Sequence, residues 1–206
     1  MLTLHHLADS RSKATLWLLE ELGEPYEIVR YERDPVTRLA PPELEAVHPL
    51  GKSPMVTDGD GVLIESGAIV EILVRRYGRG RLAPEYATPA YDKYVEWLHY
   101  SEGSAMLPLM LKLYVARLGN AGAPLHPRIE GEIARHLGHI DRSLTGREWL
   151  LGDFSAADIQ LSFVGEVARA WDLSASNYPA LDAWVARFRT RAAYLRALEK
   201  GGPYSF

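Results

Sequence analysis

The sequence of 206 residues contains no cysteine. Disulfide bonds, thiolate metal sites and mechanisms in which the protein supplies a nucleophilic or redox-active thiol are therefore excluded. Any thiol chemistry must use a thiol that the substrate brings. A metal site is not expected either, because His136 and His139 lie three residues apart on a predicted helix without an accompanying cysteine or HExxH pattern.

The sequence also lacks a long apolar run and an excess of basic residues. No stretch approaches the roughly 20 apolar residues that a membrane-spanning helix needs. Met1 leads into Leu2-Thr3-Leu4 without the basic start and small-residue cleavage site of a signal peptide. With 23 basic and 27 acidic residues the formal charge is −4, which gives no basic field for a nucleic-acid backbone. We therefore expect a cytoplasmic protein with neither a membrane nor a nucleic acid as partner.

The first 80 residues alternate between strand and helix patterns. Residues 2–7 are typical of a buried strand, residues 14–22 of a helix that ends at Gly23, and residues 26–31 of a second strand. Strand, helix and strand in this order predict a right-handed parallel crossover. A short irregular helix is expected before His48, ahead of a hairpin and a further helix.

Residues 50–67, LGKSPMVTDGDGVLIESG, combine a proline-led strand, a tight turn and the start of a helix. The two Asp-Gly pairs supply the positive φ angles of a hairpin. The helix begins at Ser66, beside Glu65, and the first turn of a helix favours a carboxylate or a phosphate. This edge suits a ligand end that carries both a carboxylate and an ammonium group. The alternative is that Ser66 only caps the helix.

After a polar connector at residues 81–88, no strand pattern returns. Pro89 begins a long helix in which Pro108 is expected to produce a kink. Ser155 and Asp158 form a short version of the capping box at the start of a buried helix. The predicted helices of this half span residues 89–118, 127–144, 156–170 and 179–188. We therefore predict a domain with a four-stranded mixed sheet at residues 1–80, a linker at 81–88 and an all-helical domain at 89–206.

Five segments resemble the cytosolic glutathione S-transferase family along the whole chain. They are SRSKATLWLLEELG, HPLGKSPMV, LIESGAIVEIL, WLHYSEGSAMLPLMLKL and FSAADIQLSF. Each segment is weak evidence alone, whereas five in the right order and spacing are specific. The SRS loop and the long helix look like those of bacterial and fungal members that use serine. The resemblance implies a two-domain α+β fold with an N-terminal thioredoxin-like domain (βαβ-α-ββα) and a C-terminal all-α helical bundle.

The resemblance also implies glutathione-binding roles in the first domain. Pro54 matches a proline that is cis in this fold, which lets the backbone of Ser53 pair with the cysteinyl part of glutathione like an added strand. Glu65 and Ser66 match the pair that holds the γ-glutamyl end. Lys52 matches a residue that faces the glycyl carboxylate, and the alternative for Lys52 is an exposed loop lysine.

Ser10 is the predicted catalytic residue, because its distance from the helix matches the family pattern. Its hydroxyl and the helix start would both stabilise a thiolate without a general base. Ser12 is expected to be the N-cap of this helix. Whether Ser10, Ser12 or a histidine contacts the thiol stays open, since His5 and His6 are adjacent on a strand and point to opposite faces.

The second domain is expected to supply the electrophile site, next to the SRS loop. Aromatic and adaptable apolar side chains suit varied hydrophobic substrates. The candidates are Tyr100, Met106, Met110, Tyr114 and Trp171. For each of them singly, a place in the core is the alternative.

The leading prediction is a glutathione S-transferase that forms the glutathione thiolate and conjugates it to a small hydrophobic electrophile, with a detoxifying role. Glutathione is the co-substrate and no other cofactor is expected. The resemblance also implies a homodimer. The alternatives are a glutathione-dependent isomerase, dehalogenase or peroxidase of the same fold, and a non-catalytic binding module. An intact set of Ser10, Pro54, Glu65 and Ser66 argues against the module, but the sequence does not separate the reaction types.

Overall fold

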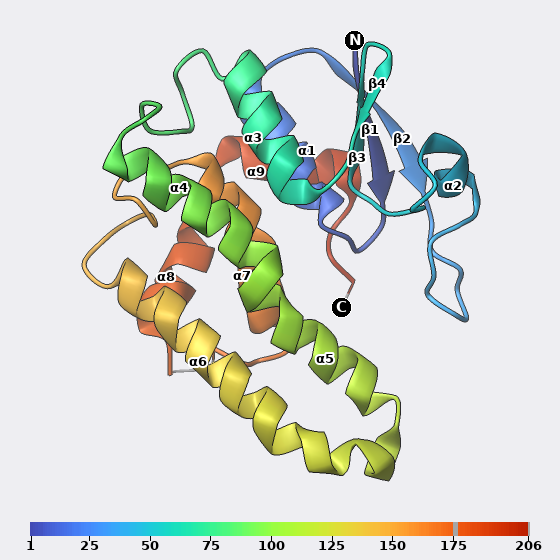
Figure 1. The fold of residues 1–206 in the computed structure, drawn as a ribbon, viewed down its shortest axis with the longest axis vertical. Coiled ribbons are helices and arrows are strands. Elements are labelled where there is room, and N and C mark those ends of the chain that lie inside the picture. Colours follow the sequence, from blue (N-terminus) through green and yellow to red (C-terminus); the bar gives the residue numbers. More distant parts are fainter. Residues whose placement is uncertain (175–176, 206) are drawn as a thin grey trace. The chain divides into compact units, whose positions relative to one another are not determined.

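The computed structural model describes residues 1–174 and 177–205 and forms two compact units (Figure 1). Unit 1 consists of Met1–Ala83 together with residues 188–205, and unit 2 consists of Pro84–Arg187. The sequence-based division had grouped residues 188–205 with the helical domain. In the structure they pack with the sheet-containing unit, so that unit 1 is built from two separate stretches of chain.

Unit 1 contains a four-stranded mixed sheet in the order β2-β1-β3-β4. The strands are β1 (Leu2–Leu7), β2 (Tyr26–Tyr31), β3 (Met55–Asp58) and β4 (Gly61–Leu63). β1 pairs with β2 in parallel, as a strand-helix-strand crossover requires, and with β3 in antiparallel fashion. The hairpin of β3 and β4 closes through Gly59, whose φ is 62°. The predicted mixed sheet and the βαβ-α-ββα order are confirmed.

The helices of unit 1 include α1, which contacts both α3 and α9 (Figure 1). They are α1 (Ser12–Leu22), α2 (Glu43–Val47), α3 (Ser66–Tyr77) and α9 (Ala192–Gly201). Trp17 of α1 is fully buried, and its ring centroid lies 5.5 Å from that of Phe188 and 5.2 Å from that of Tyr194. Aromatic contacts between distant parts of the sequence therefore fix the C-terminal segment on this unit.

Unit 2 is helical, as predicted. Its helices are α4 (Pro89–Tyr100), α5 (Met106–Ala116), α6 (His126–Leu144), α7 (Ala156–Ala170) and α8 (Pro179–Phe188), the last residue of which belongs to unit 1. A 3₁₀ segment, Gly119–Leu125, joins α5 to α6. Within the two described stretches of the chain, no helix is both long enough and apolar enough to cross a membrane.

The predicted kink of the long helix takes the form of a π-helical turn, Ser101–Ala105, between α4 and α5. The N–H of Met106 donates to the carbonyl of Ser101, five residues earlier. Pro108 has no N–H to offer the carbonyl of Ser104, and its ring crowds that carbonyl, so a widened turn before the proline relieves the clash.

The start of α7 holds the most deeply buried carboxylate among the described residues. Asp158 is 0% exposed, and its Oδ1 accepts hydrogen bonds from the N–H of Leu150 at 3.1 Å and from Nε1–H of Trp184 at 2.9 Å. Its Oδ2 accepts from the N–H of Ser155 at 3.0 Å, and the Ser155 hydroxyl accepts from Ala157 N–H at 3.3 Å. The predicted capping box is therefore present, and it also anchors α8 through Trp184.

Candidate active site

Ser10 lies in the loop between β1 and α1 and is only 4% exposed. Its hydroxyl oxygen lies 2.9 Å from the carbonyl oxygen of Leu7, to which it can donate, and it accepts from Ser12 N–H at 3.2 Å. α1 begins at Ser12 and has Arg11 at its N-cap position. The Ser10 hydroxyl thus sits at the N-terminal end of α1, where the helix field favours a negative charge.

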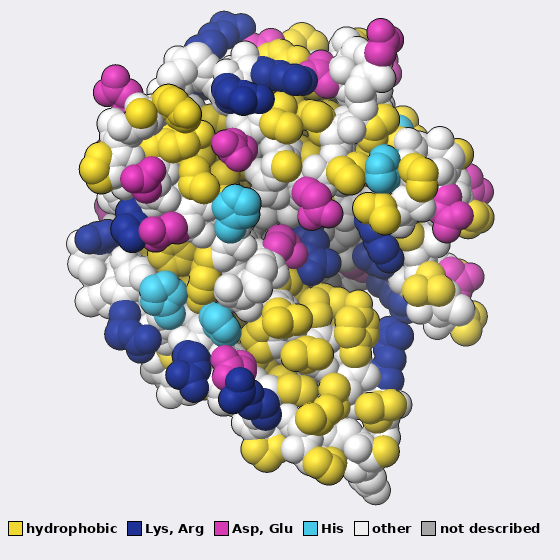
Figure 2. Space-filling model, viewed as in Figure 1, with side chains coloured by type: hydrophobic (Ala, Val, Ile, Leu, Met, Phe, Trp, Pro, Cys, Tyr) yellow, Lys and Arg dark blue, Asp and Glu magenta, His cyan; other side chains and the backbone are white. Residues whose placement is uncertain are grey.

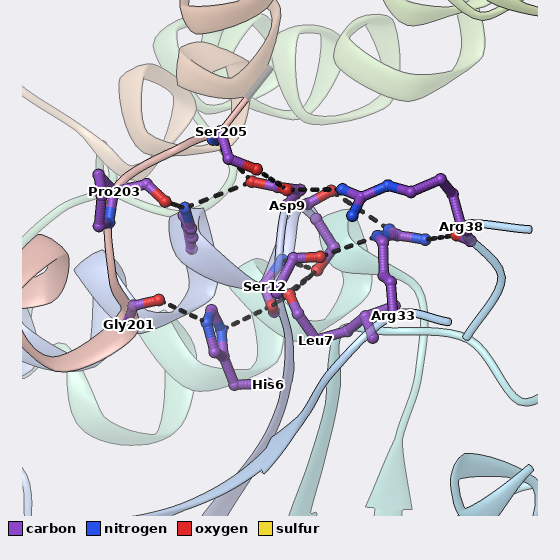
Figure 3. Close-up of polar contacts among 12 residues, drawn as sticks. His6, Leu7, Asp9, Ser12, Arg33, Arg38, Gly201, Pro203 and Ser205 are labelled. Atoms are coloured by element: carbon purple, nitrogen blue, oxygen red, sulfur yellow. Dashed lines mark hydrogen bonds and ion pairs between the residues drawn. The ribbon is translucent and has the colours of Figure 1, made fainter. Parts of the chain in front are cut away.

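Ser12 is not the N-cap that the sequence predicted. It is the first residue of α1, and its hydroxyl turns toward the end of β1 (Figure 3). Its Oγ lies 2.7 Å from Oγ of Ser10 and 2.8 Å from Nδ1 of His6. The buried imidazole offers this hydroxyl a stronger acceptor or donor than the helix N–H groups do.

The loop that carries Ser10 is held from several sides. Asp9 has a φ of 50°, a left-handed conformation that costs a non-glycine residue roughly 1–2 kcal/mol. Its carboxylate accepts from the N–H of Ser205 at 2.9 Å and from Nη2 of Arg38 at 2.9 Å (Figure 3). Arg33 donates to the carbonyls of Ala8 at 2.9 Å and of Asp9 at 3.2 Å. These contacts fix the loop in a single backbone conformation.

Ser53 and Pro54 are joined by a cis peptide bond directly before β3. The Ser53 hydroxyl donates to the carbonyl of His5 at 2.9 Å and accepts from Leu7 N–H at 3.3 Å. Leu7 therefore contacts Ser53 through its N–H group and Ser10 through its carbonyl. Two residues that lie more than forty positions apart in the sequence meet at the C-terminal end of β1.

Glu65 and Ser66 form the start of α3, directly after the hairpin. Glu65 is exposed and has a φ of 65° and a ψ of 113°, whereas Ser66 is 8% exposed. Val56 pairs with Leu63 across the hairpin, so the chain that leaves β4 toward Glu65 runs back past the start of β3. α3 therefore follows a strand that pairs with β3, and β3 begins directly after Pro54.

The two candidate serines share a local feature that the sequence analysis missed. Ser10 follows Asp9 and Ser66 follows Glu65, and both acidic residues have positive φ. Strained backbone of this kind collects at ligand-binding sites, where it aims the next residue. An acidic residue directly before a serine at a helix start was the available signal.

Lys52 lies exposed in the loop between α2 and β3. The preceding Gly51 has a φ of 54°, and a Cβ there would come within 2.8 Å of Cγ of Glu45. Glycine is therefore required for the backbone path of this loop, and that path determines where the Lys52 side chain projects from the surface. An exposed lysine here can extend toward a ligand carboxylate or stay solvated.

Three of the predicted electrophile-site residues lie on α5 and differ in exposure. Met106 is 2% exposed and belongs to the core, Met110 is half-buried and Tyr114 is 55% exposed. Figure 2 shows hydrophobic side chains gathered over α5, and Leu107 and Leu111 are among the exposed ones. An apolar surface is therefore available on this helix.

The other two predicted residues lie elsewhere in unit 2. Tyr100 ends α4, and its hydroxyl is 2.9 Å from Nδ1 of His136. Burial raises the pKa of Tyr100, so its phenol stays protonated at neutral pH. It lines an open hollow of about 900 Å³ with other residues of α4, Tyr91 and Val95 among them. Trp171 is half-buried at the C-terminal end of α7.

The two histidines that raised the question of a metal have other partners. His136 contacts Tyr100 as described, and His139 stacks on Trp97 with ring centroids 5.5 Å apart. Among residues 1–174 and 177–205, no three His, Asp or Glu side chains lie close enough together to hold a metal ion.

The structure resolves which strand histidine approaches Ser10. The ring nitrogens of His5 lie 3.0 Å from Oη of Tyr31 on β2 and from Oγ1 of Thr57 on β3. His6 instead faces Ser12 of α1. Alternation along β1 predicted opposite faces but not which face meets α1, because both flanks of this central strand are buried.

Comparison with known proteins follows the two halves of the chain. Residues 1–75 match the family model described as the glutathione S-transferase N-terminal domain, and residues 104–192 match that of the C-terminal domain. Glutathione S-transferase 3 of Schizosaccharomyces pombe is 37% identical over 97% of this chain and 88% of its own length. Glutathione S-transferase 1 of Saccharomyces cerevisiae is 29% identical over 97% and 95%.

Solved structures agree. A glutathione S-transferase from Actinobacillus pleuropneumoniae has a TM-score of 0.89 and 36% identity, with 99% of this chain and 94% of that chain covered. A glutathione transferase family member from Pseudomonas fluorescens, crystallised with two glutathione molecules bound, has a TM-score of 0.82 and 27% identity over 96% and 92%. With both halves matched and the relatedness extending over nearly the whole chain, the protein belongs to the glutathione S-transferase family.

Proposed function

We propose that this protein is a glutathione transferase that binds glutathione at the C-terminal end of β1 and conjugates its thiol to a small hydrophobic electrophile. The observation that carries the proposal is the position of Leu7, which contacts Ser10 on one side and Ser53 on the other. Glu65 and Ser66 follow β4, which pairs with the strand that begins after Pro54. We infer that a single peptide-like ligand reaches all of these groups.

Each part of glutathione has a chemically matched partner in this arrangement. The backbone of Ser53 pairs with the cysteinyl residue as an added strand would. The exposed carboxylate of Glu65 attracts the γ-glutamyl ammonium group. The Ser66 hydroxyl and the N-terminal end of α3 receive the γ-glutamyl carboxylate. Lys52 is suited to the glycyl carboxylate as a solvated, flexible charge.

Ser10 stabilises the thiolate in this proposal. A thiol with a pKa of about 8.5 is only a few per cent ionised at pH 7, and the thiolate is the attacking form. Lowering that pKa by two units requires roughly 2.7 kcal/mol of preference for the anion. A charge-assisted hydrogen bond contributes roughly 1.5–3 kcal/mol and a helix end up to about 1 kcal/mol, which together suffice.

The electrophile is a small apolar molecule in this proposal. Tyr114, Met110 and the leucines on the surface of α5 provide an apolar face that needs no charged partner. Met106 supports this face from the core. Tyr100 and Trp171, both half-buried, remain candidates.

We further propose a cytoplasmic homodimer with a detoxifying role. Two-fold pairing is the commonest state of soluble oligomers, and the family resemblance implies it. Light scattering at micromolar concentration tests the assembly. A mass of twice the 23.0 kDa of one chain supports it, and a mass of one chain refutes it.

Two measurements in sequence test the proposed activity. Retention on immobilised glutathione tests binding, and a conjugation assay with a chlorodinitrobenzene acceptor tests the transfer. Retention with conjugation supports the transferase, and retention without turnover of any electrophile in a panel supports a binding module. Turnover confined to isomerisation, dehalogenation or peroxide reduction would reassign the reaction type.

A further inference from the structure

A chain of hydrogen bonds leads from Ser10 into the interior of unit 1. The Ser10 and Ser12 hydroxyl oxygens are 2.7 Å apart, and Ser12 Oγ is 2.8 Å from Nδ1 of His6. On its other side, Nε2 of His6 is 3.1 Å from the carbonyl oxygen of Gly201, at the end of α9 (Figure 3). Ser10, Ser12 and His6 are all buried.

The carbonyl of Gly201 determines the direction of this chain. A carbonyl oxygen only accepts, so Nε2 of His6 carries the proton and Nδ1 of the neutral ring has a free lone pair. Ser12 must then donate to Nδ1. The short contact between the two hydroxyls requires one donor, and the Ser12 proton is used at Nδ1, so Ser10 donates to Ser12, with the Leu7 carbonyl 2.9 Å away as a second acceptor of the same proton. The protons of the resting chain then point toward His6, and Ser10 Oγ, which also accepts from Ser12 N–H, has one lone pair left as an acceptor.

We propose that His6, reached through Ser12, takes up the proton that the glutathione thiol gives to Ser10. The proposal rests on the function proposed above and changes the part that Ser10 plays in it. The S–H bond breaks as a Ser10 O–H bond forms, the former Ser10 proton moves to Ser12, and the former Ser12 proton moves to Nδ1. The products are a thiolate, two intact hydroxyls and an imidazolium.

The shift reverses the hydrogen bonds that link Ser10, Ser12 and His6, whereas Nε2–H of His6 keeps donating to the carbonyl of Gly201. Nδ1–H of His6 now donates to Ser12, Ser12 donates to Ser10, and Ser10 donates to the thiolate that it has just created. The same hydroxyl therefore accepts from the thiol and stabilises the anion, which a fixed donor cannot do. After the thiolate attacks the electrophile, the imidazolium returns its proton by the same path to the leaving group or to water.

The groups around His6 keep the resting imidazole neutral. Burial lowers the pKa of His6, and the positive charges of Lys13 on α1 and Arg30 on β2 lower it further. The hydrogen bond to the Gly201 carbonyl and the negative charge of Asp9 in the loop raise it. The resting ring is therefore neutral at neutral pH and keeps its lone pair. Once the proton arrives, the Gly201 carbonyl continues to accept from Nε2–H and supports the charged ring.

The first test compares two variants that cannot take up a proton. In His6→Asn the amide oxygen replaces Nδ1 as acceptor for Ser12, and in His6→Gln the amide nitrogen replaces Nε2 as donor to Gly201. Both should lower kcat at pH 7 by about tenfold and leave the KM for glutathione unchanged. The loss should shrink at alkaline pH, where solvent ionises the thiol. Ser12→Ala should reproduce it.

His5→Asn is the matched control, because His5 is a buried histidine on the same strand whose ring nitrogens contact Tyr31 and Thr57. Circular dichroism and retention on immobilised glutathione establish that each variant folds and binds. A His6→Asn variant with the pH profile of the unmodified protein would show that His6 only orients Ser12, and the proposal would be overturned.

The second test follows the proton itself. Glutathione is added to the protein in weak buffer with a pH indicator, and thiolate is measured by its ultraviolet absorbance. The unmodified protein should release much less than one proton per thiolate formed, because His6 holds the proton. His6→Gln should release one proton per thiolate. If the unmodified protein and His6→Gln both released one proton per thiolate formed, His6 would be excluded as the proton acceptor.

Ser10→Ala separates this proposal from the function on which it rests. If Ser10→Ala loses activity and the His6 and Ser12 variants do not, the relay is wrong and the role of Ser10 stands. If Ser10→Ala keeps full activity and thiolate formation, the relay and the role of Ser10 both fall, while the transferase activity stands.

Discussion

The starts of α7 and α1 are both buried polar clusters built around serine, yet their hydrogen bonds are organised in opposite ways. At α7 the donors converge on one carboxylate, that of Asp158, which can only accept when ionised. At α1 the cap position holds Arg11, a donor-only side chain, and the cluster consists of two hydroxyls and an imidazole. Each of these groups can donate or accept.

This difference indicates what each cluster contributes. A saturated carboxylate has one arrangement and contributes to stability, since any loss leaves buried donors unpaired. A chain of hydroxyls and an imidazole has two arrangements of protons on the same heavy-atom positions. It can change state without moving the backbone, and for that reason the backbone around Ser10 can be held as firmly as Asp9, Arg33 and Arg38 hold it.

Removing the carboxylate at α7 should have the largest effect of the predictions made here. Asp158→Ala leaves three buried N–H groups without their acceptor and should lower the free energy of unfolding by about 3 kcal/mol or more. For a chain of this size that corresponds to a melting temperature lower by roughly 6–12 °C. Calorimetry measures it, with the exposed Asp153→Ala as control. Equal melting temperatures for the two variants would contradict the stabilising role.

Removing the hydroxyl at α1 should affect the reaction and spare the fold. Ser10→Ala should lower kcat/KM at neutral pH by roughly ten- to a hundredfold, about 1.4–2.7 kcal/mol, and raise the pKa of the bound thiol. Less activity should be lost at alkaline pH. Steady-state kinetics across pH measure this. If Ser10→Ala kept its activity while Ser12→Ala lost it, the catalytic role would pass to Ser12.

The start of α3 offers a third arrangement, with a buried serine behind an exposed acid. Ser66→Ala should raise the KM for glutathione, because the γ-glutamyl carboxylate loses a charge-assisted hydrogen bond. The loss of binding free energy should be about 1–2 kcal/mol. kcat should change little. Glu65→Gln should act in the same direction through the ammonium group. Unchanged KM values in both variants would remove these residues from the site.

The smallest expected effect concerns Asp9, whose carboxylate helps to hold the Ser10 loop. Burial alone would raise the pKa of Asp9, but hydrogen bonds from Ser205 and Arg38 and the positive charge of Lys13 outweigh it, so the pKa is lowered. A carboxylate with a lowered folded-state pKa stabilises above its unfolded-state value and loses that effect as pH falls through the folded-state value.

Asp9→Asn should therefore reduce the free energy of unfolding at pH 7, by less than about 1 kcal/mol because the group is partly screened by solvent. The difference from the unmodified protein should shrink as pH falls below the ordinary Asp pKa and vanish below the lowered folded-state pKa. Urea unfolding at a series of pH values measures it. A difference that grew toward low pH would contradict this assignment of charge.

The sheet and most helix bounds were predictable because they depend on local signals. Gly23, with φ 74°, ends α1 as its position in the pattern required, and the Asp-Gly turn produced the hairpin. Ser155 and Asp158 predicted the start of α7. The residue types at these helix ends and at the turn are each favoured in few other backbone conformations.

The partners of the Ser10 loop were not predictable in the same way. Ala193, Tyr194 and Ala197 form an apolar face that would suit a helical bundle as well as it suits α1. The sequence around His6 does not predict that Gly201 lies next to its ring. Contacts of this sequence separation depend on how two stretches of chain meet, which periodicity along one stretch does not encode.

The two-part construction of unit 1 has a consequence for synthesis. Residues 188–205 leave the ribosome only after all of unit 2, a delay of about 5–20 s at ordinary elongation rates of roughly 5–20 residues per second. During that interval the face of α1 around Trp17 lacks Phe188 and Tyr194. Nascent chains of this protein should therefore expose a hydrophobic helix face to chaperones, and the relay from Ser10 to Gly201 becomes continuous only when α9 docks.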